Sequence, residues 1–300
     1  MISIQKVAQL TGHESGIYWL GEGHSAHHFL SVAGDGWLVE WDLRNPDLGK
    51  LLAKVETQAF SALLLKKEER AVVGNMNGGV HWIDLREPDN ARNILHHHKG
   101  VFSIQQIGNQ ILTAGGKGKL TRWSMEGKAI ESFQLSNKSL RSIAFFAERN
   151  EVAVGASDGN IYLLNATSFE LKKTLEKAHD NSVFSLKYSP DGNYLLSGGR
   201  DAHLNVWETE NDFQQHSSRP AHLFTVNDIC YSPNGKYFAT ASRDKTLKIW
   251  DAHTFELIKV IEMIRDKGHL NSVNAVYWSA YNNYLLSASD DRSIIIWEIK

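Results

Sequence analysis

The chain has 300 residues, of which 42% are hydrophobic and 22% are charged, and this is an ordinary globular composition. Its formal net charge of −2 comes from 32 basic and 34 acidic residues with no long block of one sign. This charge distribution gives no footprint for nucleic acid or an anionic membrane surface. We therefore expect neither of them as a partner.

Cys230 is the single cysteine, which excludes an intrachain disulfide and removes the usual thiolate ligands of a zinc site. The N-terminal segment "MISIQKVAQL" lacks a basic stretch followed by an apolar one. No segment approaches the roughly 18 consecutive apolar residues of a membrane span. We expect a soluble, cytoplasmic protein that is monomeric on its own, with Cys230 as a small buried hydrophobe.

Seven strand-like segments recur along the chain, and each ends in an aromatic or aliphatic residue followed by a polar one. In chain order they are "LVEWD" to Asp42, "VHWID" to Asp84, "LTRWS" to Ser124, "IYLLN" to Asn165, "LNVWE" to Glu208, "LKIWD" to Asp251 and "IIIWE" to Glu298. The intervals are 42, 40, 41, 43, 43 and 47 residues. A period of about 40–45 residues is typical of units with four short strands. The pattern predicts one domain, residues 1–300.

Within each unit the apolar residues alternate with a period of two, and turn sequences such as "SPDG" and "SPNG" separate the runs. The chain resembles the WD-repeat family of β-propellers over essentially its whole length. The resemblance rests on Gly-His or Ala-His pairs and on Trp-Asp or Trp-Glu pairs: Gly12-His13, Ala178-His179, Ala221-His222 and Gly268-His269, and Trp41-Asp42, Trp207-Glu208, Trp250-Asp251 and Trp297-Glu298. It implies an all-β, seven-bladed propeller of four-stranded antiparallel blades.

The phase of the repeat predicts how the last blade is completed. If each Trp ends a third strand, the chain stops one strand short at "SIIIWEIK". Residues 1–9 have the length and alternation to supply the outer strand of that blade, which would remove an open sheet edge.

Four units carry a His, a hydroxyl residue, an Asp and a Trp at fixed spacings of 18, 4 and 6 residues. The sets are His13, Ser31, Asp35, Trp41; His179, Ser197, Asp201, Trp207; His222, Thr240, Asp244, Trp250; and His269, Ser287, Asp291, Trp297. These residue types also make a hydrolase triad, but an enzyme needs one nucleophile in one pocket. Recurrence in four units favours a structural network. The resemblance implies that the His bonds to the Asp and the hydroxyl, and the Trp indole to the hydroxyl.

The other three units depart from this pattern. One keeps Thr113 and Trp123 but has Lys117 at the Asp position, and the run His96–His98 supplies its His. The second and fourth units have Val73 and Val154 at the hydroxyl position, with Ile83 and Leu164 at the Trp position. There we expect aliphatic packing in place of the polar network, with Asp158 keeping its turn and Asn77 approximating one.

Other candidate sites have simpler interpretations. Three adjacent histidines, His96–His98, cannot all face one metal ion, and His97 is the one we assign to the structural position. We interpret His24, His27 and His28 as solvated loop residues. The "GGKGKL" segment from Gly115 lacks phosphate-loop spacing and is typical of a hairpin turn. We expect no metal and no cofactor.

The resemblance places partner binding on the narrower face, at the start of each first strand and beside the Asp turn. We call these the narrow-face positions: Tyr18, Phe60, Phe102, Arg141, Phe184, Asn227 and Asn274 on first strands, with Arg200, Arg243 and Asp290 before the Asp. Aromatic residues and arginines are enriched at interaction hot spots. The alternative for each Phe is packing between blades. An acidic or apolar peptide segment is the expected ligand.

The resemblance implies a non-catalytic scaffold that binds a protein or peptide partner around the central channel. Two alternatives remain open: a constitutive subunit of a multiprotein assembly, and a propeller hydrolase with a site in the channel. Against the hydrolase, no pair of carboxylates or cluster of histidines falls on the predicted channel-facing positions.

Overall fold

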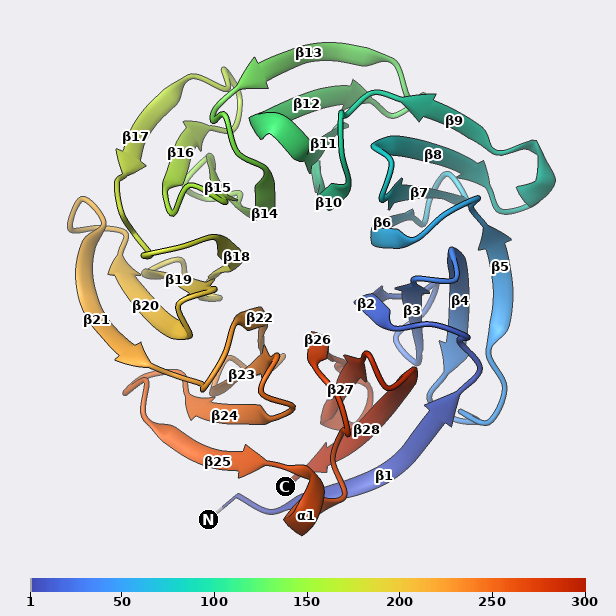
Figure 1. Ribbon diagram of the computed structural model, residues 1–300, viewed down its shortest axis with the longest axis vertical. Helices are drawn as coiled ribbons and strands as arrows, with labels where there is room; N and C mark the ends of the chain where they lie inside the picture. The colour runs from blue at the N-terminus through green and yellow to red at the C-terminus, as the bar shows by residue number, and fades with distance from the viewer. Residues whose placement is uncertain (1) are drawn as a thin grey trace. The chain divides into compact units, whose positions relative to one another are not determined.

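The computed structural model describes residues 2–300, and over that range the strands form seven four-stranded antiparallel sheets (Figure 1). The protein is an all-β, seven-bladed propeller, as the repeat period predicted. The chain divides into two compact units. One unit contains the residues up to Asn75, His81–Asn93 and Asn227–Lys300, and the other contains Met76–Val80 and Ile94–Val226. Each blade is described with the unit that holds most of it.

The first unit contains blades 1, 2, 6 and 7. Their strands are β2 (Ile17–Glu22), β3 (His28–Ala33), β4 (Trp37–Asp42) and β5 (Lys50–Lys54); β6 (Ala59–Leu65), β7 (Arg70–Asn75), β8 (Gly79–Asp84) and β9 (Arg92–Leu95); β22 (Val226–Tyr231), β23 (Tyr237–Ser242), β24 (Leu247–Asp251) and β25 (Leu257–Ile261); and β1 (Ile4–Thr11), β26 (Val273–Trp278), β27 (Tyr284–Ser289) and β28 (Ser293–Ile299).

The second unit contains blades 3, 4 and 5. Their strands are β10 (Val101–Ile107), β11 (Gln110–Gly115), β12 (Lys119–Ser124) and β13 (Ala129–Gln134); β14 (Leu140–Phe146), β15 (Glu151–Ala156), β16 (Ile161–Asn165) and β17 (Leu171–Leu175); and β18 (Val183–Tyr188), β19 (Tyr194–Gly199), β20 (His203–Glu208) and β21 (Gln214–Pro220).

Burial differs among the strands of a blade, and the sequence shows why. The second strand is the most buried, as in β15, where all six residues of "EVAVGA" are buried. The fourth strand is polar and exposed, as in β13, where only Phe133 of "AIESFQ" is half-buried. Apolar side chains from neighbouring blades meet on the faces of the inner strands, and burial of this area drives the packing.

The first and second strands are joined by tight turns in which glycine has a structural reason. In "SPDG" and "SPNG" the glycines are Gly192 and Gly235, with φ of 73° and 69°. A residue with a Cβ atom is disfavoured in this left-handed region. The turn sequences therefore specify where each hairpin reverses.

Blade 7 is closed by the N-terminal strand, as predicted. Strand β1 pairs antiparallel with β28, from Ile4 opposite Ile299 to Thr11 opposite Ser293, with one irregularity between Lys6 and Ala8. Figure 1 shows β1 in blue beside β28 in red. The observed strand runs two residues beyond the predicted range, and Met1 lies outside the described residues.

The α-helix α1 (Met263–Asp266) was not predicted from the sequence. It lies within the longest repeat interval, 47 residues, between β25 and β26. Lys267 caps it in the left-handed conformation, and its backbone N–H donates to the Met263 carbonyl at 3.0 Å. No helix of the described residues is long and apolar enough to cross a membrane.

Candidate functional site

The His, Ser, Asp and Trp of blade 1 form one hydrogen-bonded network. His13 Nε2 lies 2.8 Å from Ser31 Oγ, and its Nδ1 lies 2.9 Å from the Asp35 carboxylate. The Trp41 indole N–H donates to Ser31 Oγ at 2.8 Å. Because an ionised carboxylate only accepts, His13 Nδ1–H is the donor to Asp35, and the Ser31 hydroxyl donates to Nε2. These contacts match the roles implied by the resemblance.

Blades 5 and 7 repeat the same geometry. His179 contacts Ser197 at 2.8 Å and Asp201 at 3.0 Å, and Trp207 donates to Ser197 at 2.9 Å. In blade 7, His269 contacts Ser287 at 2.8 Å and Asp291 at 2.9 Å, and Trp297 donates to Ser287 at 2.9 Å.

Blade 6 carries the fourth set with a threonine. Trp250 donates to Thr240 Oγ1 at 2.9 Å, and both side chains are buried. Asp244 accepts from the Thr246 backbone N–H at 3.0 Å and from its hydroxyl at 2.6 Å. His222 is also buried, at 6% exposure.

The network keeps its aspartates ionised. Burial by itself raises the pKa of Asp35, Asp201 and Asp291, but hydrogen bonds from the paired histidine and from backbone N–H groups outweigh it. The pKa of each carboxyl is therefore below its usual value. In blade 7 the backbone donor is the N–H of Leu270, at 2.9 Å.

The same geometry excludes a role for these serines as nucleophiles. The Ser31, Ser197 and Ser287 side chains are 0% exposed. Each hydroxyl is held between an imidazole and an indole, so no face is open to a substrate carbonyl. In blades 1, 5 and 7 the sets brace the first strand's entry loop against the second and third strands, and their hydrogen bonds are a structural arrangement.

Blade 3 shows what happens when the Asp is missing. His97 Nε2 lies 2.8 Å from Thr113 Oγ1, and Trp123 donates to the same oxygen at 2.8 Å, so His97 is the structural histidine as predicted. Its Nδ1 is buried without a hydrogen-bond partner among residues 2–300. Lys117, at the Asp position, has a φ of 56°. Burial lowers the pKa of His97 to about 3, with smaller effects from His96 and Lys119.

Blade 2 packs Val73 and Ile83 at 1% and 0% exposure, which confirms the aliphatic substitution. The expectation that no polar network remains there was wrong. Asn75 and His81 form a buried pair, with Asn75 Nδ2 2.9 Å from His81 Nε2. Burial lowers the pKa of His81. Its signal in the sequence is the histidine within the apolar strand "VHWID".

Blade 4 likewise packs Val154 and Leu164 in the core but contains a substitute network. Asp158 accepts a hydrogen bond from the Ser136 hydroxyl at 2.5 Å and one from the Tyr162 hydroxyl at 2.7 Å. Ser136 occupies the histidine position, 22 residues before Asp158, as His179 precedes Asp201. The sequence analysis missed Ser136 because only a histidine was expected at this position.

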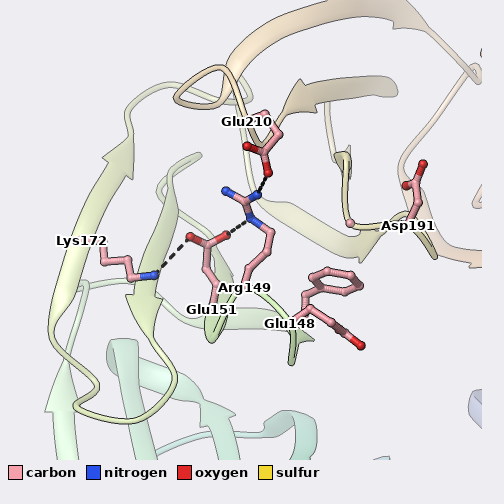
Figure 2. A pocket seen from close by; sticks show the side chains of 8 residues that line it. Glu148, Arg149, Glu151, Lys172, Asp191 and Glu210 are labelled. Atoms are coloured by element: carbon pink, nitrogen blue, oxygen red, sulfur yellow. Dashed lines mark hydrogen bonds and ion pairs between the residues drawn. The ribbon is translucent and has the colours of Figure 1, made fainter.

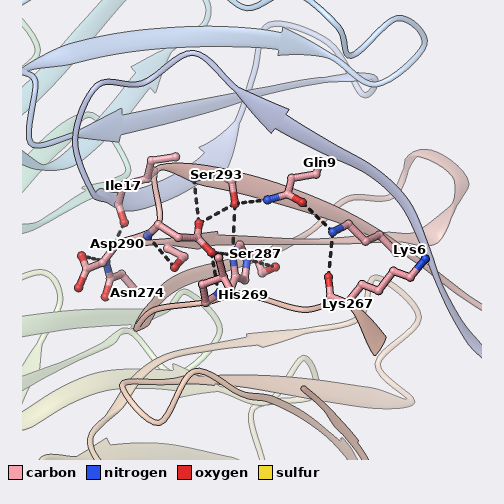
Figure 3. A network of polar contacts seen from close by, with 12 residues as sticks. Lys6, Gln9, Ile17, Lys267, His269, Asn274, Ser287, Asp290 and Ser293 are labelled. Atoms are coloured by element: carbon pink, nitrogen blue, oxygen red, sulfur yellow. Dashed lines mark hydrogen bonds and ion pairs between the residues drawn. The ribbon is translucent and has the colours of Figure 1, made fainter. Parts of the chain in front are cut away.

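In blade 7 the brace extends into the N-terminal strand. Ser293 Oγ donates to Asp291 at 2.6 Å, and Gln9 Nε2 donates to Ser293 Oγ at 2.9 Å. Lys6 Nζ then donates to Gln9 at 2.7 Å and to the Lys267 carbonyl at 2.8 Å. Figure 3 shows this chain of contacts running from His269 to Lys6. Strand β1 is therefore connected to the His, Ser, Asp and Trp network of blade 7 by side-chain hydrogen bonds as well as by backbone pairing.

Three narrow-face positions of the second unit come together. The Arg141 guanidinium carbon lies 4.1 Å from the Phe102 ring centre and 5.3 Å from that of Phe184, so the cation sits between two rings from the neighbouring blades. Arg141 Nε donates to Ser157 Oγ at 2.9 Å. Arg200 is exposed in the same unit. Both phenylalanines are half-buried, so each packs against Arg141 and keeps a partly open surface.

In the first unit, the narrow-face positions divide into two groups. Tyr18 and Phe60 form an edge-to-face pair with ring centres 5.2 Å apart. Asn227 and Asn274 each reach the next blade, where they donate to the Val273 carbonyl at 2.8 Å and the Ile17 carbonyl at 3.0 Å. The two asparagines therefore brace adjacent blades.

The last two narrow-face positions are exposed. Asp290 accepts a hydrogen bond from Asn274 Nδ2 at 2.7 Å, as Figure 3 shows. Burial, with a smaller contribution from the charge of Asp290, raises the pKa of Tyr18. Arg243 forms no ion pair with any residue that the structure describes.

Known proteins are similar to this chain in three of its repeats and in its fold. The family described as "WD domain, G-beta repeat" matches residues 169–208, 213–251 and 259–298. The crystal structure of the WD40 β-propeller domain of Doa1 superposes with a TM-score of 0.85 at 19% identity, covering 99% of this chain and 97% of that one. This chain therefore has the fold of a seven-bladed β-propeller, and three of its repeats are similar to the WD-repeat family.

Curated relatives are similar over shorter alignments. Cilia- and flagella-associated protein 43 of Xenopus laevis is 24% identical over 64% of this chain, and Periodic tryptophan protein 2 homolog of Mus musculus is 23% identical over 68%. The alignments span 12% and 24% of those proteins. Eukaryotic translation initiation factor 3 subunit I of Brugia malayi is 23% identical over 53% of this chain and 54% of that protein. Their names describe no enzyme.

The second unit of the propeller has a polar cavity of about 390 Å³, lined mainly by charged residues. Glu151 lies at its centre, 4% exposed, and accepts a hydrogen bond from the buried Tyr188 hydroxyl at 2.9 Å. Lys172 and Arg149 approach Glu151 at 3.6 and 3.8 Å, and Arg149 also pairs with Glu210 (Figure 2). Both cations of this cavity, Arg149 and Lys172, are already paired with its carboxylates.

Of the histidines predicted to be solvated, His24 is exposed, whereas His27 and His28 are half-buried, which corrects the prediction for those two. His27, His28 and Asp42 offer ligand atoms within 4.8 Å of one another. The Asp42 carboxylate is already held by Arg44, whose Nη2 donates at 2.7 Å, so the carboxylate is not available to a metal ion. In the run His96–His98, His96 and His97 contact separate hydroxyls, on Thr121 and Thr113, so they do not converge on one ion.

Proposed function

We propose that this propeller is a non-catalytic interaction scaffold, and that a protein or peptide partner binds the narrow-face positions. One observation carries the proposal: equivalent backbone positions of successive blades present different, half-buried or exposed side chains. A repeated backbone with varied surface residues can specify a partner without chemistry of its own. A single, buried cysteine fits a reducing compartment, and we place this function in the cytoplasm.

The braces support a scaffold and weaken the case for a hydrolase. Their serine hydroxyls are fully buried and occupied by hydrogen bonds, so they hold the blades in register. Rigid elements that present side chains with little ordering cost bind partners more tightly than flexible ones.

A second form of the same function is a permanent subunit of a multiprotein assembly. One relative, Eukaryotic translation initiation factor 3 subunit I, is named as a subunit. A subunit and a hub differ in the number and stoichiometry of their partners.

Affinity purification of the tagged protein from its native cells, with quantitative mass spectrometry, tests the proposal. One stoichiometric partner supports a subunit, and several substoichiometric partners support a hub. No partner, together with turnover in a hydrolase screen, would refute a scaffold. Arg200→Glu and Arg243→Glu, made separately, should each reduce recovery of a narrow-face partner. The matched control is Lys128→Glu, an exposed charge reversal before β13.

A further inference from the structure

Arg141 is an unusually constrained cation. Its planar guanidinium lies between the rings of Phe102 and Phe184, and these three residues come from the first strands of blades 3, 4 and 5. Stacking on aromatic faces fixes the plane of the group and removes water from both sides. Burial lowers the pKa of Arg141, and the charge of Arg200 lowers it further.

The positive charge of Arg141 has no counter-ion among the residues that the structure describes. Of the donors of Arg141, Nε is used by Ser157, and Nη1 and Nη2 have no hydrogen-bond partner among residues 2–300. Neither Arg141 nor Arg200 forms an ion pair with a described residue. Arginines are rarely removed from water without a partner, because desolvation of the charge is costly.

Packing between blades does not explain this arrangement by itself. A neutral side chain would fill the space between two phenylalanines without the cost of a desolvated charge. Arg200 is close enough for its charge to act unfavourably on Arg141, and no carboxylate offsets it. Two like charges held together in this way are stabilised when an anion binds between them.

We propose that Arg141 and Arg200 form an anion-recognition site for the carboxylate of a Glu or Asp side chain in a partner protein. This inference rests on the proposed scaffold function and names the chemistry of its ligand. The two free terminal nitrogens of Arg141 present the planar edge that a carboxylate meets with two parallel hydrogen bonds. A monoanion also loses less hydration energy than a phosphate dianion beside two apolar rings, so a carboxylate is favoured over a phosphorylated residue.

The test uses the whole protein and a displayed library of random twelve-residue peptides. We expect selected peptides to share an Asp or Glu. Synthetic peptides with that residue changed to Gln or Asn should bind about 10-fold or more weakly. Arg141→Gln and Arg200→Gln should each weaken the acidic peptide to a similar extent. Neither substitution should further weaken binding of the peptide that carries Gln or Asn, since the contact between the arginines and the peptide carboxylate is already lost.

The controls separate a local loss from a loss of fold. Arg200 is exposed, so Arg200→Gln should keep the melting temperature even where Arg141→Gln does not. Lys128→Gln, at an exposed position before β13 and outside the narrow-face positions, should leave the affinity of these peptides unchanged.

Three results would overturn the site. The first is that the selected peptides lack an acidic residue, and the second is that peptide binding is insensitive to both Gln variants. The third is that a phosphoserine peptide binds at least 10-fold tighter than its Glu counterpart. Failure to select any peptide would also overturn it. None of these results touches the scaffold function, which is decided independently by the partners recovered from cells.

Discussion

His269 Nδ1 lies 2.9 Å from the carboxylate of Asp291, and the same carboxylate accepts a hydrogen bond from Ser293, which in turn accepts one from the N-terminal strand. One buried pair thus connects the loop before blade 7, the turn within it and the strand that closes it. The strength of such a network depends on every member having a partner.

Removal of the aspartate from one of these networks should therefore lower the free energy of unfolding. We expect Asp201→Ala and Asp291→Ala each to cost about 1–3 kcal/mol of unfolding free energy, because each leaves a buried histidine Nδ1 without its acceptor. Lys117→Ala, at the equivalent position of blade 3, should cost less than about 0.5 kcal/mol. Urea or guanidinium denaturation measures all three, and equal losses would contradict the role given to the aspartates.

The same carboxylates predict an acid-sensitive fold. The pKa of each of Asp35, Asp201 and Asp291 is lower in the folded chain than in the unfolded one. Their stabilisation is therefore complete above the unfolded value of about 3.9 and is lost as the pH falls through the folded values. The melting temperature should drop steeply below about pH 4. Asp291→Asn should show a smaller drop between pH 4 and pH 2, whereas Asp89→Asn, at an exposed position, should follow the wild type.

Deletion of residues 2–9 should open blade 7. It removes most of β1, including the side-chain links through Lys6 and Gln9, and exposes the edge of β28. With a net value of about 0.5–1.5 kcal/mol for each lost hydrogen bond, the expected loss is on the order of 3–6 kcal/mol. Differential scanning calorimetry measures it, with Lys6→Ala as the control that removes only the side-chain link. An unchanged melting temperature for the deletion would mean that β1 does not close the blade in solution.

Tyr188 should contribute to stability through its hydroxyl. Burial and the charge of Glu151 raise the pKa of Tyr188, so the hydroxyl stays protonated and donates to that buried carboxylate. Tyr188→Phe leaves the carboxylate with one donor fewer and should cost about 1.5–3 kcal/mol. Tyr284→Phe is the matched control, because the Tyr284 hydroxyl has no hydrogen bond among the described residues, and it should cost much less. Similar losses for the two variants would show that the hydroxyl of Tyr188 is unimportant.

The parts of this protein that the sequence predicted are those that repeat. The six intervals between the seven segments are similar, and the spacing of His, Ser or Thr, Asp and Trp occurs four times, so a chance match at one position did not matter. The substitutes were missed because they occur once. Ser136 in blade 4 keeps the histidine spacing but with another residue type, and the Asn75–His81 pair in blade 2 follows no shared spacing, so only the fold shows what they contact.

The narrow-face positions show a different limit. Their numbers follow from the repeat, but the role of each side chain depends on the neighbouring blade. Arg141 lies between phenylalanines 39 residues before it and 43 after it in the chain, and no local pattern reports that arrangement. Asn227 and Asn274 were predicted to face a partner. The structure shows that each also donates a hydrogen bond to the adjacent blade.

The pairing of β1 with β28 has a consequence for synthesis of the chain. On a ribosome working at about 5–20 residues per second, β1 emerges on the order of 14–60 s before its partner strand. Throughout that interval the strand has no sheet to join. It carries the polar residues Gln5, Lys6 and Gln9 among its apolar ones, and charged or polar side chains make a strand less prone to pair with other chains. β1 is thus suited to remain unpaired in water until β28 has been synthesised.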